Sequence, residues 1–205
     1  MTLQDHIKLY TQKAQSLISI DTMEATDVLG KNISYLDAFI ELIKIIRVTQ
    51  DFGQMVYLIG NGGSAGIASE NANRLRKYCK IRTMSFNDPI TMSASANDSP
   101  LGWPGVFVEP LQAYIKTGHV LIAISSSGNS PNIINAVATA RQVNALVVTL
   151  SGFDAENHLR KLGNLNFYIP SSDYQLVEGA HSHILGSVTN TLIKISQHEI
   201  VLKEI

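Results

Sequence analysis

The sequence has almost no cysteine. Cys79 is the single one in 205 residues, which excludes an intrachain disulfide and a cage of thiolates around a metal. One unpaired thiol is typical of a protein kept in a reducing compartment, so the cytoplasm is the expected location. We expect Cys79 itself to be a buried structural thiol.

An excess of charge is also missing. Lysine and arginine number 16 against 17 aspartates and glutamates, for a formal net charge of −1. A nucleic-acid surface needs a clustered excess of basic residues, so we expect no nucleic-acid partner. No apolar run approaches the roughly 20 residues that span a bilayer, and the N-terminus lacks the basic and apolar regions of a secretory signal. We therefore expect no membrane partner either.

What is present is a strong alternation of structural patterns. Apolar residues recur at helical spacing over residues 4–20 and 27–51, which predicts an N-terminal helical arm over residues 1–52 that packs on a partner subunit as well as on the core. Beyond it, residues 53–205 are expected to form one structural unit of the α/β class, a parallel sheet covered by helices on both faces. The expected strands cover residues 55–60, 82–86, 119–125, 144–150 and 165–169, and the expected helices cover 63–79, 105–117, 131–143, 155–162 and 176–201.

Two loops rich in glycine and serine follow expected strands. GNGGS (60–64) follows the first strand, and SSSGNS (125–130) follows the third. Glycine lets the backbone approach a ligand, serine hydroxyls donate hydrogen bonds, and the helix that follows offers free N–H groups to an anion. Each loop alone could be a plain turn. Because parallel sheets bind ligands at the carboxyl ends of their strands, the two together predict one phosphorylated ligand held from both sides.

The first loop allows a second interpretation. Residues 60–65 match the dinucleotide fingerprint G-x-G-x-x-A, and Asp88 stands near the end of the next expected strand, as that motif requires. A nicotinamide enzyme has no evident use for a second serine-rich loop, and the long segment before the first strand is not its usual arrangement. Dinucleotide binding is therefore the weaker alternative.

Four segments, in order and spacing, resemble the sugar isomerase (SIS) domain family, and within it the phosphoheptose isomerases. They are GNGGSA (60–65), AND (96–98), AISSSGNSPNIINAV (123–137) and VTLSGFD (148–154). The resemblance implies a three-layer αβα sandwich with a five-stranded parallel sheet, assembled as a homotetramer with active sites at subunit interfaces. It also implies the conversion of sedoheptulose 7-phosphate to D-glycero-D-manno-heptose 7-phosphate through an enediol, an early step of bacterial surface (lipopolysaccharide) heptose synthesis.

The resemblance also implies roles for individual residues. By position, the phosphate would be held by Ser64, Ser125, Ser126, Ser127 and Ser130. The sugar chain would be met by Asn61, Gly62 and Gly63 of the first loop and by Asn97 and Asp98.

An aldose–ketose isomerase needs a base that moves a proton between two neighbouring carbons. Glu178 and His181 lie three residues apart in the last expected helix and so share one helical face. Either is a candidate base, with Asp98 as an orienting group or acid. The alternative for the Glu178 and His181 pair is an ordinary solvated helix face.

One departure from the family concerns zinc. Phosphoheptose isomerases commonly place a histidine and an acidic residue on the helix after GNGGS, and a glutamine and a second histidine on the last helix, as zinc ligands and catalytic groups. The matching positions here are Glu70, Arg74, Glu178 and Gly186. Glu70, Glu178 and His181 could be combined into a metal site, but the charge of Arg74 disfavours a cation. The resemblance makes zinc a possible cofactor, but because its usual ligand positions are substituted we expect no tightly held zinc and assign no cofactor.

Three hypotheses stay open, the third being another enzyme, such as an isomerase that acts on a different sugar phosphate. In the first, Arg74 pairs with Glu70 or Glu178, or stands in for the metal by stabilising an enediolate. In the second, the chain is a non-catalytic SIS protein that binds a sugar phosphate or docks a partner as a regulator. Turnover of a sugar phosphate separates an isomerase from such a binding protein.

Overall fold

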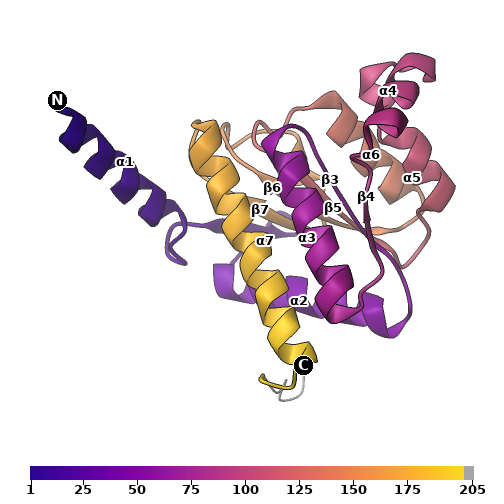
Figure 1. Ribbon diagram of the computed structural model, residues 1–205, viewed down its shortest axis with the longest axis horizontal. Helices are drawn as coiled ribbons and strands as arrows, with labels where there is room; N and C mark the ends of the chain where they lie inside the picture. The colour runs from indigo at the N-terminus through magenta and orange to yellow at the C-terminus, as the bar shows by residue number, and fades with distance from the viewer. Residues whose placement is uncertain (201–205) are drawn as a thin grey trace.

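A computed structural model describes residues 1–200 of the chain and shows a mixed sheet with helices on both faces (Figure 1). Its seven strands have the order β2-β1-β7-β6-β5-β3-β4. Five of them are parallel to one another: β3 (Val56–Gly60), β4 (Thr83–Ser85), β5 (Val120–Ser125), β6 (Leu146–Ser151) and β7 (Leu165–Tyr168). These are the five expected strands, so the α/β class and the parallel core of the sheet are confirmed.

An apolar core lies on each face of the sheet, between the sheet and the helices that cover that face. Along β5 the side chains of Val120, Ile122 and Ile124 enter one core, whereas those of Leu121 and Ala123 enter the other, as the alternation of a strand dictates. The first core is closed by α2 (Tyr35–Asp51), α3 (Gly63–Cys79) and α7 (Tyr174–Ser196), and the second by α5 (Val108–Tyr114) and α6 (Pro131–Gln142). Because both faces of β5 are buried, its sequence is a continuous apolar run.

The N-terminal region differs from the expectation of two helices. Residues 27–34 are not helical: β1 (Glu24–Asp27) and β2 (Asn32–Ile33) form a hairpin, and β1 pairs antiparallel with β7. Its turn is fixed by the Asp27 carboxylate, which accepts hydrogen bonds from two backbone N–H groups, and by Gly30 at φ +74°. Ser34 then caps α2, which is why the second helix begins eight residues later than the pattern suggested.

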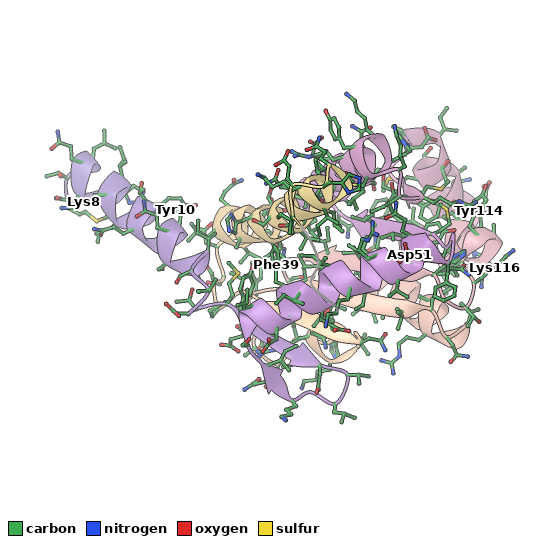
Figure 2. The ribbon with its side chains drawn as sticks, turned by 90° about the horizontal axis from the view of Figure 1, so that it is seen from below. Lys8, Tyr10, Phe39, Asp51, Tyr114 and Lys116 are labelled. Atoms are coloured by element: carbon green, nitrogen blue, oxygen red, sulfur yellow. The ribbon has the colours of Figure 1, made fainter. Side chains whose placement is uncertain are left out.

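The rest of the arm divides into two parts. The buried face of α2 belongs to the same core as the sheet, whereas α1 (Leu3–Leu17) extends away from the body (Figures 1 and 2). A hydrogen bond from the Tyr10 hydroxyl to Asp173 Oδ1, 3.3 Å long, joins α1 to α7. Leu3, Ile7 and Leu9 of α1 are exposed. In the described part of the chain no helix has the length and apolar character needed to cross a membrane.

Two further expectations are corrected. A helix, α4 (Pro89–Asp98), occupies a segment for which none was expected, because the Asp88 side chain caps it and Pro89 suits its first turn. Residues 155–162 are not a full helix, and only the short 3-10 turn η2 (Leu159–Lys161) forms there. Another short turn, η1 (Trp103–Gly105), precedes α5.

Candidate active site

The two serine-rich loops meet at the carboxyl ends of β3 and β5. These strands are neighbours in the sheet, and the five parallel strands follow the order β4-β3-β5-β6-β7, so the chain turns in opposite directions on either side of this point. Open α/β sheets bind ligands at such a topological switch point. A pocket of about 370 Å³ lies here, which we call the serine pocket. Its lining residues are Asn61, Gly62, Ser64, Ile124, Ser125, Ser126, Ser127, Ser130, Tyr174 and Glu178.

The two helices that follow the serine-rich loops have no side-chain caps. Among the described helices of ten residues or more, α1, α2, α4 and α7 each begin with a side chain that accepts a backbone N–H. Neither α3, which begins after Gly62, nor α6, which begins after Ser130, has such a cap. In α3 the N–H groups of Gly63 and Ser64 therefore remain available to an anion, with the positive end of the helix dipole behind them. In α6 the Asn132 N–H remains, because Pro131 has no N–H and Ile133 donates to the Ser130 carbonyl.

A pair of side-chain amides ties the first loop (60–64) to α6. Asn61 Nδ2 donates to Asn132 Oδ1 over 3.0 Å, and Asn132 Nδ2 donates to Asn61 Oδ1 over 2.8 Å. Gly62 has φ +54°, and an added Cβ at Gly60 would overlap Ser64. Glycine at these two positions is thus needed for the tight turn from β3 into α3.

Serine hydroxyls form the inner surface of the second loop. Ser125 Oγ donates to Ser130 Oγ over 3.3 Å, and Ser127 Oγ accepts the backbone N–H of Asn129. Ser126 Oγ is buried and has no hydrogen-bond partner among the described residues. A buried hydroxyl without a partner is costly unless a ligand satisfies it. The loop therefore has the unsatisfied donor expected of an anion site.

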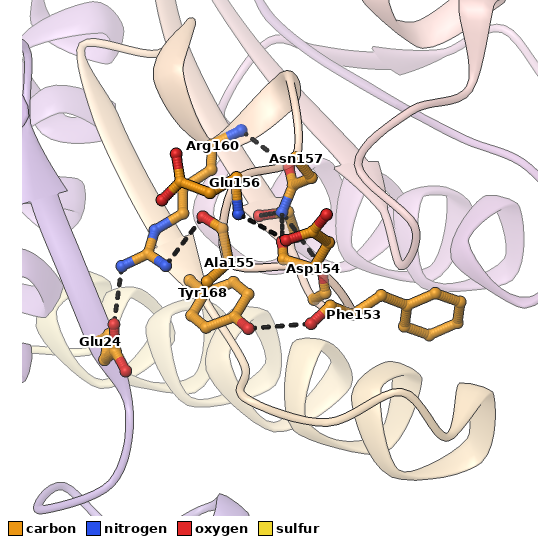
Figure 3. Close-up of polar contacts among 10 residues, drawn as sticks. Glu24, Phe153, Asp154, Ala155, Glu156, Asn157, Arg160 and Tyr168 are labelled. Atoms are coloured by element: carbon orange, nitrogen blue, oxygen red, sulfur yellow. Dashed lines mark hydrogen bonds and ion pairs between the residues drawn. The ribbon is translucent and has the colours of Figure 1, made fainter.

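The segment after β6 supports this loop from behind, and Figure 3 shows its centre, Asn157. The buried amide of Asn157 donates to the carbonyls of Asp154 (2.7 Å) and Gly152 (3.1 Å) and to Ser151 Oγ (3.3 Å). Its Oδ1 accepts the backbone N–H of Arg160. These bonds replace the helical ones that the sequence pattern had suggested for residues 155–162.

Asn157 also contacts the serine loop directly. Gly128 has φ +63°, and a Cβ there would overlap the Asn157 side chain. The backbone N–H of Leu159 donates to the Gly128 carbonyl over 2.9 Å, and that of His158 donates to Asn129 Oδ1. Residues 125–130 are thereby held between the sheet and the segment 152–160.

Glu178 is the one acidic side chain among the described residues that line the serine pocket. It lies in the second turn of α7, whose start is fixed by Asp173. Its carboxylate packs so closely on Gly63 that a Cβ there would overlap it. Glycine at position 63 therefore leaves space for a carboxylate beside the first turn of α3.

His181 is placed differently from Glu178. It is fully buried and does not line the serine pocket. Its Nε2 donates to the Ser151 carbonyl over 3.1 Å, while Nδ1 has no partner in the described chain. Burial lowers the pKa of His181 to about 4, because desolvation disfavours the imidazolium. The ring is neutral at pH 7 and its position favours a structural role behind β6.

Asn97 and Asp98 lie apart from the serine loops within one chain. They end α4, where Asn97 Nδ2 donates to Asp98 Oδ1 over 2.7 Å. Asp98 lines another pocket, of about 540 Å³, between α4 and α5, with Ser95 and Glu109 on its walls. A single subunit therefore does not assemble these two residues with Ser64 and Ser125–Ser130.

The positions that matched zinc ligands do not fit zinc. Among residues 1–200, no three histidine, cysteine, aspartate or glutamate side chains come together as a metal site. Arg74 takes part in none of the ion pairs found in that part of the chain, so the expected pairing with Glu70 or Glu178 is not formed there. Its Nε is buried without a hydrogen-bond partner. A cation on α3 disfavours a metal ion nearby, and we derive no step through zinc.

Three residues of this region escaped sequence reasoning: Asn132, Asn157 and Tyr174. Asn132 follows Pro131 in the first turn of α6, where an asparagine could have been recognised as a partner for the Asn61 amide. No sequence pattern marked Asn157 as important, because its partners are mostly backbone groups. Asp88, which the dinucleotide hypothesis required, caps α4 and does not line the serine pocket.

Comparison with known proteins identifies the family. The SIS domain model matches residues 14–152. The phosphoheptose isomerase of Photorhabdus laumondii is 38% identical over 149 residues, 68% of this chain and 76% of the relative. That of Aliarcobacter butzleri is 33% identical over 144 residues, 67% and 75% of the two chains. The solved structure of a phosphoheptose isomerase from Francisella tularensis superposes with a TM-score of 0.78 at 21% identity, over 95% of this chain and all of that one.

The chain belongs to the SIS domain family. Within this family, the relatives just described are phosphoheptose isomerases.

Proposed function

We propose that the protein is an aldose–ketose isomerase that converts sedoheptulose 7-phosphate to D-glycero-D-manno-heptose 7-phosphate, an early step of bacterial surface heptose synthesis. The observation that carries this proposal is the serine pocket, where uncapped helices and hydroxyl groups surround a space that also holds one carboxylate. The phosphoheptose isomerases among its relatives support the choice of substrate.

In this proposal the phosphate is bound by neutral donors. The hydroxyls of Ser64, Ser126 and Ser130 line one pocket, beside the uncapped starts of α3 and α6. Binding energy from the phosphate does not enter the reaction itself, but it orients the sugar carbons that react.

Glu178 is proposed as the base. Its carboxylate takes the proton from the hydroxyl-bearing carbon beside the carbonyl while the carbonyl oxygen gains a proton, which leaves an enediol. The carboxylate then returns its proton to the neighbouring carbon, and the hydroxyl on the first carbon loses its proton to become the new carbonyl, so that aldose and ketose interconvert without loss of atoms. Glu178 is favoured over His181 because it lines the pocket, whereas His181 is buried behind β6. The roles of Asp98 and Arg74 remain predictions.

We also propose a homotetramer with active sites at subunit interfaces. Asn97 and Asp98 are outside the serine pocket of their own chain, so a neighbouring subunit has to supply them if they meet the sugar. The exposed apolar residues of α1 offer a surface for such contacts. Light scattering after gel filtration tests the number of subunits. A cytoplasmic location is proposed on the single unpaired cysteine.

The test of function is conversion of sedoheptulose 7-phosphate followed by NMR in deuterated buffer, with added zinc and with a chelator. We expect conversion with deuterium incorporation at C2 that is insensitive to the chelator, and a loss of about 10²–10⁴-fold in kcat in Glu178→Gln. The matched control is Glu41→Gln, an exposed glutamate on α2 that does not line the pocket. Thermal stabilisation by the sugar phosphate without any exchange would assign the protein to the non-catalytic class instead.

A further inference from the structure

A second hollow lies at the opposite end of the strands that carry the serine pocket. It has a volume of about 490 Å³ and lies beside the amino ends of β3 and β5, and we call it the basal pocket. Its lining includes Tyr57, Arg82, Met84, Tyr114, Lys116 and His119. With about 3.3 Å per residue along the six residues of β5, it lies on the order of 17 Å from the serine loops. The proposed isomerase reaction uses none of these residues.

The charged groups of the basal pocket all have one sign. Arg82, Lys116 and His119 line it, and no aspartate or glutamate does so among the described residues. Burial lowers the pKa of the His119 ring, and the charges of Lys116 and Arg82 lower it further, so the two cations act on the same space as the imidazole. In a chain with a net charge of −1, such a one-signed cluster is the feature of an anion site.

Hydrogen bonds already orient two of these groups. Arg82 Nη1 donates to the Gly53 carbonyl over 2.8 Å, which fixes the guanidinium and leaves its other N–H groups available. His119 Nδ1 accepts the backbone N–H of Lys116 over 3.3 Å, so that the neutral ring carries its proton on Nε2. Both side chains are therefore held as donors.

Aromatic rings form another wall of the basal pocket. The Tyr114 ring is 52% exposed and is stacked on Phe86, with centroids 6.3 Å apart and planes 19° from parallel. Phe86 is stacked in turn on Tyr57 at 5.6 Å. Figure 2 shows Tyr114 beside Lys116, at the end of the molecule opposite α1. A half-exposed ring supported from behind is a stacking surface for a planar group.

We propose that the basal pocket is a second ligand site, for a nucleoside monophosphate. Its phosphate would be bound by Arg82, Lys116 and His119, and its base would stack on Tyr114 beside the exposed Met84. The pocket volume falls in the range of sites for such small molecules. This proposal does not depend on the isomerase activity, because it concerns the other end of the sheet.

The test is NMR of the histidine rings in the full-length protein during titration with AMP, with adenosine and inorganic phosphate as separate probes. His119→Gln identifies the His119 resonance by its loss. We expect AMP to shift that resonance with a dissociation constant below about 1 mM, and each of the other probes to bind at least about tenfold more weakly.

Two variants locate the binding. Arg82→Gln with Lys116→Gln is expected to weaken AMP binding by about tenfold or more, whereas Lys13→Gln with Arg76→Gln, which removes two exposed charges elsewhere, leaves it unchanged. Isomerase activity and thermal unfolding confirm that the first variant is folded. The absence of any AMP-induced shift, or an equal shift in the first variant, would overturn the proposal. Phosphate binding as tight as that of AMP would overturn the assignment of a ring-bearing ligand.

Discussion

Pockets of similar size lie at the two ends of β3 and β5, but the chemical groups that line them differ. At the carboxyl ends, the serine pocket offers uncapped helix termini and serine hydroxyls, and its one acidic or basic residue is Glu178 among the described ones. At the amino ends, the basal pocket offers two cations, a histidine and aromatic rings. The same pair of strands thus presents dipoles at one end and full charges at the other.

This difference follows from what parallel strands place at each end. The carboxyl end of a strand leads into the N-terminus of the next helix, so backbone N–H groups converge there and long cationic side chains are not required. At the amino ends the incoming loops supply no such donors, and recognition of an anion has to come from side chains. Backbone donors are fixed by the fold, whereas a side-chain donor needs its own support, as Arg82 has from the Gly53 carbonyl, or has to be ordered by a ligand.

The largest effect is expected from Gly63→Ala. The new Cβ would overlap the Glu178 carboxylate, which is the mobile end of its side chain, so the carboxylate moves while the backbone stays. Displacement of a catalytic group by about 1 Å can lower a rate by about 10²-fold. We expect kcat to fall by at least that factor, with the phosphate still bound and AMP binding at the basal pocket unchanged, as measured by NMR turnover and calorimetry.

Gly66→Ala is the matched control for this prediction. Gly66 lies on the same helix, and a Cβ there would meet no atom within 4 Å. Its activity should equal that of the parent protein. Full activity in Gly63→Ala would remove Glu178 from the reaction.

The next effect concerns the support of the serine loop. Asn157→Ala removes the amide that donates to Gly152, Asp154 and Ser151. The buried Gly152 carbonyl and Ser151 hydroxyl lose this donor, whereas the Asp154 carbonyl keeps the backbone N–H of residue 157. We expect a loss of about 2–3 kcal/mol in the free energy of unfolding and about tenfold weaker sugar-phosphate binding. Urea denaturation and calorimetry measure the two losses, and Asn73→Ala, an exposed asparagine on α3, serves as control. A sugar-phosphate affinity equal to that of the parent would show that the loop holds its shape without segment 152–160.

The buried histidine behind β6, His181, makes the stability of the fold depend on pH. The unfolded chain protonates His181 below its ordinary pKa of 6.5, whereas the folded chain does so only below about 4. Between these values the unfolded state binds more protons, so stability is fully present above pH 6.5 and falls as the pH drops toward 4. From pH 7 to pH 5 we expect this residue to remove about 2 kcal/mol of stability.

Urea unfolding at the two pH values tests that expectation. His181→Gln keeps a donor for the Ser151 carbonyl and cannot be protonated, so its loss between pH 7 and pH 5 should be about 2 kcal/mol smaller than that of the parent. His183→Gln, an exposed histidine on the same helix, should behave like the parent. Equal slopes in all three proteins would mean that His181 reaches solvent in the folded state.

The sequence could predict the strands and the loops but not how distant segments pair. β5 was evident because a strand buried on both faces is apolar throughout. The loops at 60–64 and 125–130 were evident because glycine and serine have few other uses at the ends of such strands. The hairpin of β1 and β2 was missed because the pattern of residues 27–34 also suits a helix, and its pairing with β7 joins residues far apart in the chain.

Similar limits apply to the candidate site. Glu178 and His181 share the spacing that puts two residues on one helical face, yet Glu178 lines the serine pocket and His181 is buried. The angle at which α7 packs on the sheet decides between them, and no local pattern encodes that angle. The basal pocket was not foreseen for the same reason, since Arg82, Tyr114 and His119 come from separate elements.

The smallest effect expected is the response of the two pockets to salt. Raising sodium chloride from 0.05 M to 0.5 M shortens the Debye length from about 14 Å to about 4 Å. Because Arg82 and Lys116 are charged and exposed, we expect the dissociation constant of AMP, followed by the His119 resonance, to rise about three- to fivefold. The serine pocket offers neutral donors to the proposed phosphate in the described chain, so calorimetry with the sugar phosphate should show a change below about twofold. Equal salt dependence at both pockets would indicate that cations of a neighbouring subunit complete the serine pocket, and the contrast between dipoles and charges would then belong to the single chain alone.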